Sequence, residues 1–146
     1  MKKFVFVIFT LASLQAMAQP DRIVGVWVTP EKDARIHIFK NGSRYYGKMI
    51  WLTPSVDDKG NALTDTQNPD ATKRTRKLEG LEIITDLEYA DKKWKGSIYD
   101  PESGQTYSAQ LRLLAENKLE LNGYVGTPLF GRKEIWTREA GHLNSR

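Results

Sequence analysis

From residue 22 onward the chain is divided into eight short runs in which apolar and polar side chains alternate, and this pattern limits the fold more than any other feature. Such alternation predicts β-strands, and turn residues between the runs, such as Asn41-Gly42, predict hairpins. Eight strands joined as sequence neighbours close naturally into an antiparallel up-and-down barrel, whose interior is filled or holds one small ligand. A two-sheet sandwich is the alternative. The predicted strands are residues 22–28, 35–40, 43–52, 81–89, 94–100, 105–115, 118–125 and 132–138.

Aromatic side chains are frequent in these strands and are candidates to line a ligand cavity. On strand 43–52 the two-residue period places four side chains on one face: Tyr45, Gly47, Met49 and Trp51. In an eight-stranded barrel such residues also fill the interior, so a filled core is the alternative. The aromatic candidates for ligand binding are Tyr45, Trp51, Trp94, Tyr99 and Tyr107.

One long segment, residues 53–80, has no strand pattern. Connections longer than roughly 12–15 residues are uncommon in compact domains, and they are usually functional or disordered. Within this excursion Asn68-Pro69-Asp70 is typical of a helix start, and Gly80 follows as a C-terminal cap. The sequence therefore predicts a barrel with one long loop that carries a short basic helix over residues 69–79.

The N-terminus has the three parts of a secretory signal peptide: Lys2 and Lys3, an apolar run over residues 4–14, and Ala16-Met17-Ala18 as a cleavage site. We expect a signal peptide at 1–18, one barrel domain at 19–140 and a tail at 141–146. No other apolar run approaches the roughly 20 residues that span a membrane. The chain has no cysteine, so neither a disulfide nor a lipid-anchoring cysteine is available. The predicted location is periplasmic or secreted.

Charge and motif content exclude several classes of function. The formal net charge is +4 and falls to +2 when the two lysines of residues 1–18 are removed, which is too little to argue for nucleic acid or a membrane surface. His37 and His142 have no metal-ligand spacing, and no serine lies in a Gly-x-Ser-x-Gly motif. We predict neither a metal site nor a cofactor.

Acidic residues in the excursion do not match the helix–loop–helix calcium pattern, because Lys59 and Ala62 would occupy its third and sixth positions. They are typical of a solvated turn. An irregular cation site is the alternative, formed by Asp57, Asp58, Asp65 and Asp70.

Basic residues of the excursion suggest an anion site. Arg74 and Arg76 are suited to hold a carboxylate or phosphate through paired hydrogen bonds, with Asp65 orienting one of them and Asn68 beside them. The alternative is that these side chains complement a helix dipole and pin the excursion to the barrel wall.

Two sets of residues resemble known families. Gly25-Val26-Trp27, Trp136 and Arg138 resemble the closure of lipocalin and calycin barrels, in which an arginine packs across a tryptophan. More of the chain, from Gly25 to Arg138, is similar to the exported bacterial proteins called domain of unknown function 2147. That resemblance implies a lipocalin-like barrel and export, and it implies no activity. It is carried by residues 47–51, 65–69, 74–76, 80–81, 94–101, 104–107 and 136–138, with departures at Lys77 and Lys95.

Three functions are compatible with these features. The first is a non-enzymatic exported barrel that binds a small, partly apolar or amphiphilic ligand, with the excursion as a lid and Arg74 or Arg76 at the anionic end of the ligand. The second is a protein-interaction or envelope-stress module with a filled core. The third is a hydrolase-type enzyme that uses Asp65, Asp100 and Tyr99 as acid–base groups. The sequence leaves the oligomeric state open.

Overall fold

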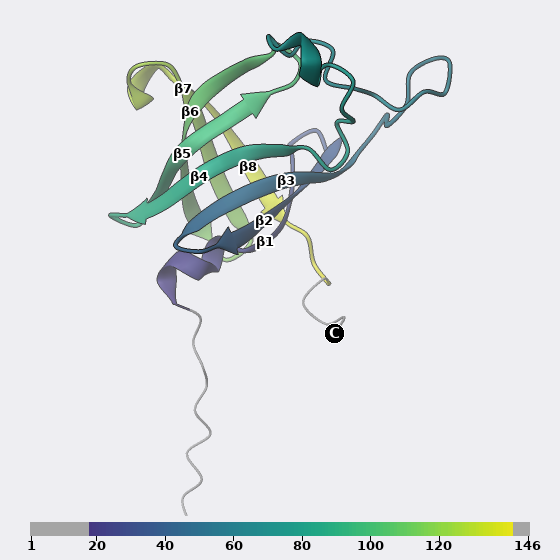
Figure 1. Ribbon diagram of the computed structural model, residues 1–146. Helices are drawn as coiled ribbons and strands as arrows, with labels where there is room; N and C mark the ends of the chain where they lie inside the picture. Colours follow the sequence, from purple (N-terminus) through teal and green to yellow (C-terminus); the bar gives the residue numbers. More distant parts are fainter. Residues whose placement is uncertain (1–17, 142–146) are drawn as a thin grey trace, which may run out of the picture.

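The computed structural model describes residues 18–141, and these residues form one barrel (Figure 1). Nearly all of the predicted signal peptide, together with His142 and the rest of the tail, lies outside the described residues. No helix within the described range is long and apolar enough to cross a membrane.

Eight antiparallel strands form the closed barrel, in which every strand pairs with its neighbours in the chain and β1 pairs with β8 to complete the ring. The predicted all-β, eight-stranded up-and-down barrel is confirmed. Its strands are β1 (Gly25–Val28), β2 (Ala34–Asn41), β3 (Arg44–Leu52), β4 (Glu82–Ala90), β5 (Lys93–Asp100), β6 (Gln105–Ala115), β7 (Lys118–Tyr124) and β8 (Arg132–Arg138).

One end of the barrel is closed by η1 (Gln19–Ile23), a short 3-10 turn beneath the strands (Figure 1). Ile23 is completely buried, and its carbonyl oxygen accepts a hydrogen bond from Trp27 Nε1 at 2.9 Å. The carbonyl oxygen of Pro20 accepts one from Trp94 Nε1 at 3.0 Å. The prediction that a strand starts at residue 22 is wrong by three residues, because the side chains of Trp27 and Arg138, and not a neighbouring strand, bond the carbonyl groups of residues 22–24.

Arg138, the last residue of β8, fastens this closed end. Its guanidinium carbon lies 4.3 Å from the centre of the Trp27 ring. Burial lowers the pKa of the Arg138 guanidinium, and the charge of Glu116 opposes that shift. Gly25 is required beside it, because the backbone there has φ of 145° and a Cβ would lie 2.5 Å from Arg138 Nη1. The guanidinium donates to the carbonyl oxygens of Arg22, Val24 and Glu116 at 2.6, 2.8 and 2.8 Å.

The hydrophobic core lies in the half of the barrel next to η1. Paired residues of neighbouring strands share a face of the sheet, so the register identifies the inward-facing side chains. The most deeply buried of these near the closed end are Trp27, Ile36, Ile38, Tyr45, Leu87, Trp94, Leu111 and Leu119.

The opposite end carries the four longer connections, including the excursion between β3 and β4 (Figure 1). The predicted helix over residues 69–79 is wrong in extent: only η2 (Ala71–Lys73) forms, capped by the side chain of Asp70. Beyond it Lys77 pairs with Thr64, and the Asp65 N–H donates to the Arg76 carbonyl oxygen at 2.9 Å. Pairing with the first half of the excursion therefore holds residues 76–77 extended.

A β-bulge changes which way one predicted ligand residue points. The register of β2 with β3 shifts between Arg35 and Ile36, so Met49 pairs with Ile36 and Trp51 pairs with Arg35. The Arg35 guanidinium carbon lies 4.3 Å from the centre of the Trp51 ring. The prediction that Trp51 shares a face with Tyr45 is wrong, because the extra residue in the bulge turns Trp51 to the outer face.

Candidate functional site

Several inward-facing side chains in the open half of the barrel are only partly buried, although Ile84, which pairs with Ile98, is completely buried. Ile98 and Tyr107 pair across β5 and β6, and both retain exposed surface. Because their strand faces are directed into the barrel, this exposure indicates an opening in the interior at this end. The partly exposed inward-facing residues are Met49, Ile98, Tyr107, Gly123 and Glu134.

Small residues leave space at this open end. Gly123 of β7 pairs with Ala109 of β6, so its missing side chain would point inward. A Cβ at Gly123 would meet only Ile98 Cγ2, at 3.9 Å, which is ordinary van der Waals contact. By comparison, a Cβ at Gly47 in the closed half would lie 2.9 Å from Ile84. The wall at Gly123 can therefore accept a larger side chain, whereas the wall at Gly47 is full.

Polar groups accompany the apolar ones in the opening. Glu134 pairs with the buried Leu121 and therefore faces inward, where its Oε2 accepts a hydrogen bond from Trp136 Nε1 at 3.2 Å. Its Oε1 lies 3.7 Å from Arg132 Nη2. Arg132 is the next inward-facing position, and 83% of its side chain is exposed. One carboxylate and one cation thus lie on the same inward row of β8.

A second group of polar residues centres on Asp65, which is completely buried. Its Oδ1 accepts the Tyr99 hydroxyl at 2.5 Å. Its Oδ2 accepts Asn68 Nδ2 at 2.8 Å, and Arg76 Nε and Nη2 at 3.2 and 2.9 Å. Tyr99 lies on the outer face of β5, one position from the inward-facing Ile98. This Asp65 cluster therefore joins the excursion to the outside of the barrel wall.

Electrostatics favour the ionised form of Asp65. Burial alone would raise the pKa of its carboxyl, but the hydrogen bonds from Tyr99, Asn68 and Arg76 outweigh burial and hold that pKa below its ordinary value. Burial, and then the contact with Asp65, raises the pKa of the Tyr99 hydroxyl. Both oxygens of the Asp65 carboxylate are occupied, so this carboxylate is committed to internal hydrogen bonds.

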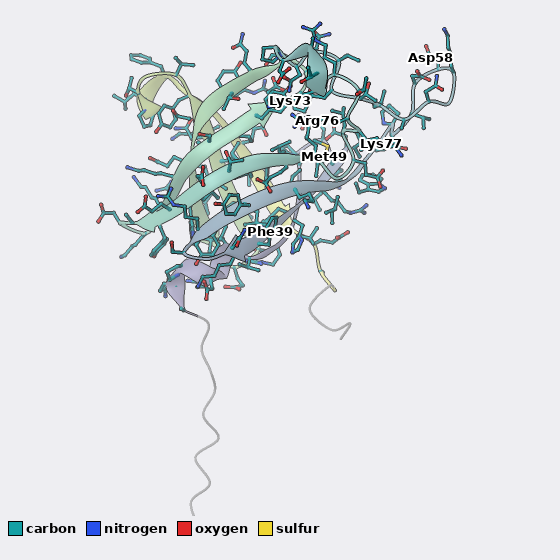
Figure 2. The ribbon with its side chains drawn as sticks, viewed as in Figure 1. Phe39, Met49, Asp58, Lys73, Arg76 and Lys77 are labelled. Carbon is teal, nitrogen blue, oxygen red and sulfur yellow. The ribbon has the colours of Figure 1, made fainter. Side chains whose placement is uncertain are left out.

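Basic side chains of the excursion reach solvent; Figure 2 labels Lys73, Arg76 and Lys77 along this segment. Arg74 Nε donates to the Asn68 carbonyl oxygen at 2.7 Å. Arg76 uses two of its nitrogens on Asp65. Both arginines are thus anchored by one edge of the guanidinium while the side chain remains exposed.

The structure separates the predicted ligand residues into three places. Asp65, Asn68, Arg76 and Tyr99 meet in the Asp65 cluster, and Arg74 lies beside it. Tyr107 faces the open interior. Tyr45 and Trp94 are buried at the closed end, where the Tyr45 hydroxyl donates to Asp21 at 2.5 Å and Trp94 donates to η1. Trp51 lies on the outer face.

Glu134 and Gly123 of the opening were not among the residues predicted from the sequence, whereas Trp136 was predicted as part of the barrel closure. Glu134 and Trp136 lie two positions apart in a strand, so the alternation already indicates that they share a face. Gly123 carries no such signal, because a glycine in a strand also marks bulges and close approaches.

Two acids of the excursion, Asp57 and Asp70, accept hydrogen bonds from nearby backbone N–H groups. Asp57 accepts the N–H groups of Lys59 and Asn61 at 2.9 Å each, which forms a turn. Asp100 likewise accepts the Glu102 N–H and the Ser103 hydroxyl, and it does not join the pair of Asp65 and Tyr99. Among residues 18–141, no group of three or more histidine, aspartate or glutamate side chains is arranged to hold a metal ion.

Two hollows open on the outside of the protein. The first, about 330 Å³, lies beside the closed end and is lined by Lys40, Tyr45 and Glu88 among others. The second, about 410 Å³, lies in the excursion between residues 55–56, 62–63, Lys77 and Glu79. Neither is lined by the inward-facing residues of the open end.

Comparison with known proteins agrees with this architecture. Residues 25–138 match the model of a family described as "Uncharacterized protein conserved in bacteria (DUF2147)". The chain belongs to the DUF2147 family. A solved structure similar to this DUF2147 chain is protein HP1028 from Helicobacter pylori, described as belonging to the lipocalin family. It has a TM-score of 0.72 and 23% identity, and the match covers 83% of this chain and 85% of that one.

The likeness to HP1028 establishes the fold of this DUF2147 protein as a lipocalin-like barrel. A comparison with curated proteins gives no match. The resemblance inferred from residues between Gly25 and Arg138 is thereby confirmed as far as family and fold are concerned.

Proposed function

We propose that this protein is an exported, non-enzymatic barrel that binds a small amphiphilic molecule in the open end of its interior. The observation that carries the proposal is the gradient of burial along the inward faces, complete near η1 and partial at Met49, Ile98 and Tyr107. Barrels of eight strands have room for one small ligand when side chains leave part of the interior open.

The ligand class follows from the side chains around the opening. Apolar surface of Met49, Ile98 and Tyr107 suits a short hydrocarbon chain or ring. An anionic end of the ligand would meet Arg132, which is exposed on the same inward row as Glu134. Arg74 is a second candidate, since its Nε alone is engaged. Arg76 is less suited to this role, because two of its nitrogens already bind Asp65.

Export and a periplasmic location are part of the proposal. The signal-peptide pattern of residues 1–18 supports them. The hydrogen bonds between η1 and the strands are a further support, since the first of them along the chain is accepted by Pro20, two residues after Ala18. The mature chain would therefore keep every residue that closes the barrel.

The test begins with native mass spectrometry of the protein isolated gently from the periplasm, which also reads its N-terminus. Delipidated protein is then titrated with a fatty acid and with a lysophospholipid while its thermal midpoint is followed. We expect a bound species or a rise in midpoint with one of them. Protein that carries no bound species and shows no thermal shift with either probe would contradict the proposal, and it would favour the filled-core alternative.

Substitution of Gly123 tests whether the ligand binds in the open interior of the barrel. Gly123→Leu should weaken binding at least tenfold, about 1.4 kcal/mol, because the new side chain would occupy the opening next to Ile98. Ser108→Leu is the matched control, since it adds the same side chain to the outer face opposite Tyr124. Isothermal titration with the ligand found above measures both variants. Equal affinity in Gly123→Leu and wild type would place the ligand elsewhere.

A further inference from the structure

The connection between β7 and β8, residues 125–131, carries the most exposed large apolar side chains among the described residues. Val125 is 77% exposed, Leu129 87% and Phe130 86%. The other large apolar side chains at the surface, such as Leu114 at 45%, are about half as exposed. Scattered apolar residues are normal on a protein surface, but three such residues within six positions mark a site of interaction.

The backbone of this loop is fixed, so the exposure is built into the fold. Residues 128–130 form η3 (Pro128–Phe130), whose first turn is capped by the Thr127 hydroxyl. The buried side chain of Asn122 donates to the Pro128 carbonyl oxygen at 2.9 Å. Gly131 packs against that amide so closely that a Cβ would lie 2.0 Å from Asn122 Oδ1. These contacts hold Leu129 and Phe130 away from the barrel.

Two cations follow the apolar tip directly. Arg132 and Lys133 are both exposed. Lys133 lies on the outer face of β8, whereas Arg132 is on the inward row, where its Nη2 lies 3.7 Å from Glu134 Oε1 while 83% of its side chain is exposed. Outside the barrel the loop therefore presents apolar side chains together with positive charge. This combination is typical of segments that lie in the headgroup region of anionic membranes.

We propose that the loop of residues 125–131 contacts a lipid bilayer that contains anionic lipids, with Leu129 and Phe130 entering its interfacial region. A stable protein interface needs about 800 Å² from each partner, which three side chains on a protruding tip cannot supply. A bilayer accepts such a tip, and its phosphates complement Lys133 on the outer face. The small net charge of the whole chain does not reveal this local combination of apolar and positively charged side chains.

The contact would hold the open end of the barrel toward the membrane, since the loop and the opening lie at the same end (Figure 1). The inference concerns the β7–β8 loop outside the barrel, whereas the proposed ligand site lies inside it, and Arg132 is the residue that both share. It stands even if the barrel binds nothing, because it rests only on the loop and its flanking cations.

The test is flotation of the protein in the form that the cell produces. Vesicles of phosphatidylethanolamine and phosphatidylglycerol, which are anionic, are compared with vesicles of phosphatidylcholine. We expect wild type to float with the anionic vesicles, less so in high salt, and Phe130→Asp to lower the bound fraction at least fivefold. Leu114→Asp is the matched control: it places the same charge on an exposed apolar position at the closed end, and its binding should equal that of wild type.

A second variant reports the depth of the contact. The native tryptophans are buried or stacked against Arg35, so Phe130→Trp adds an exposed reporter. Brominated lipids should quench this added fluorescence in anionic vesicles. The proposal is overturned if wild type does not float with anionic vesicles, if Phe130→Asp binds as well as Leu114→Asp, or if the tryptophan at 130 is unquenched. Cross-linking from position 130 to a protein in the absence of vesicle binding would also overturn it.

Discussion

At the scale of single residues, two charged side chains hold the ends of the barrel in different ways. Arg138 donates three hydrogen bonds to backbone carbonyl groups at the closed end, and it covers Trp27. Asp65 accepts hydrogen bonds from three side chains at the other end. In both cases removal of one side chain leaves several polar groups without hydrogen-bond partners. The loss of folding free energy from such unpaired groups exceeds the average net contribution of the hydrogen bonds themselves.

Replacement of Arg138 by alanine should lower the free energy of unfolding by about 3 kcal/mol, because hydrogen bonds from a charged group contribute about 1.5–3 kcal/mol each and are not additive. Urea denaturation measures this change. Arg112→Ala is the control: its ion pair with Glu120 at 3.3 Å lies on the surface, and the expected loss is below about 1 kcal/mol. Equal losses in the two variants would show that the closed end does not depend on Arg138.

Replacement of Asp65 by asparagine should cost about 2 kcal/mol at pH 7, since the amide cannot accept all the donors that face it. The pKa of Asp65 is lower in the folded than in the unfolded chain. Its contribution is therefore complete above the unfolded value, about pH 4, and is lost as the pH falls through the lower, folded value.

Urea midpoints of wild type and Asp65→Asn should therefore differ at pH 7 and converge in acid. Asp58→Asn, in the exposed tip of the same excursion, should change the stability by less than about 0.5 kcal/mol at every pH. A difference between wild type and Asp65→Asn that stays constant from pH 7 into acid would contradict the assignment of an ionised Asp65.

At the scale of elements, the excursion is held by contacts that are distant in the sequence. Gly104, in the turn between β5 and β6, has φ of 72°, and a Cβ there would lie 2.0 Å from the carbonyl oxygen of Gln67. Gly104→Ala should detach this part of the excursion and speed trypsin cleavage at Lys73 and Arg74 roughly tenfold. Gly60→Ala is matched in backbone strain, with φ of 81°, but its Cβ would meet nothing within 4 Å. Identical cleavage rates would rule out the Gly104 contact as an anchor.

The same long-range contacts explain why the excursion was less predictable than the strands. Asn68-Pro69-Asp70 carries the local signals of a helix start, but Asn68 Nδ2 bonds Asp65 and the cap is Asp70. Pairing of Lys77 with Thr64 then ends the helical turn. Strand alternation is a local property, and it was readable from the sequence. The bulge that turns Trp51 outward has no comparable signature.

At the scale of the whole molecule, the sequence contained enough to predict the barrel. It did not indicate which half of the interior is filled and which half is open. Family resemblance located Trp27 and Arg138, which are in contact at the closed end. The opening depends on which inward positions remain uncovered, and that depends on the packing of all eight strands together. Gly123 therefore became recognisable as a candidate only once the register of β6 and β7 was known, whereas the alternation along β8 already places Glu134 on the face of Trp136.

The closure of the barrel also sets an order for folding. Carbonyl groups at positions 22 and 24, near the start of the domain, are bonded by residue 138, near its end, and β1 pairs with β8. A chain emerging from the ribosome therefore lacks the contacts that complete its ring until nearly all of it has been synthesised. Such a delay is compatible with the export proposed above, because an exported polypeptide threads a translocation pore in extended form before it folds.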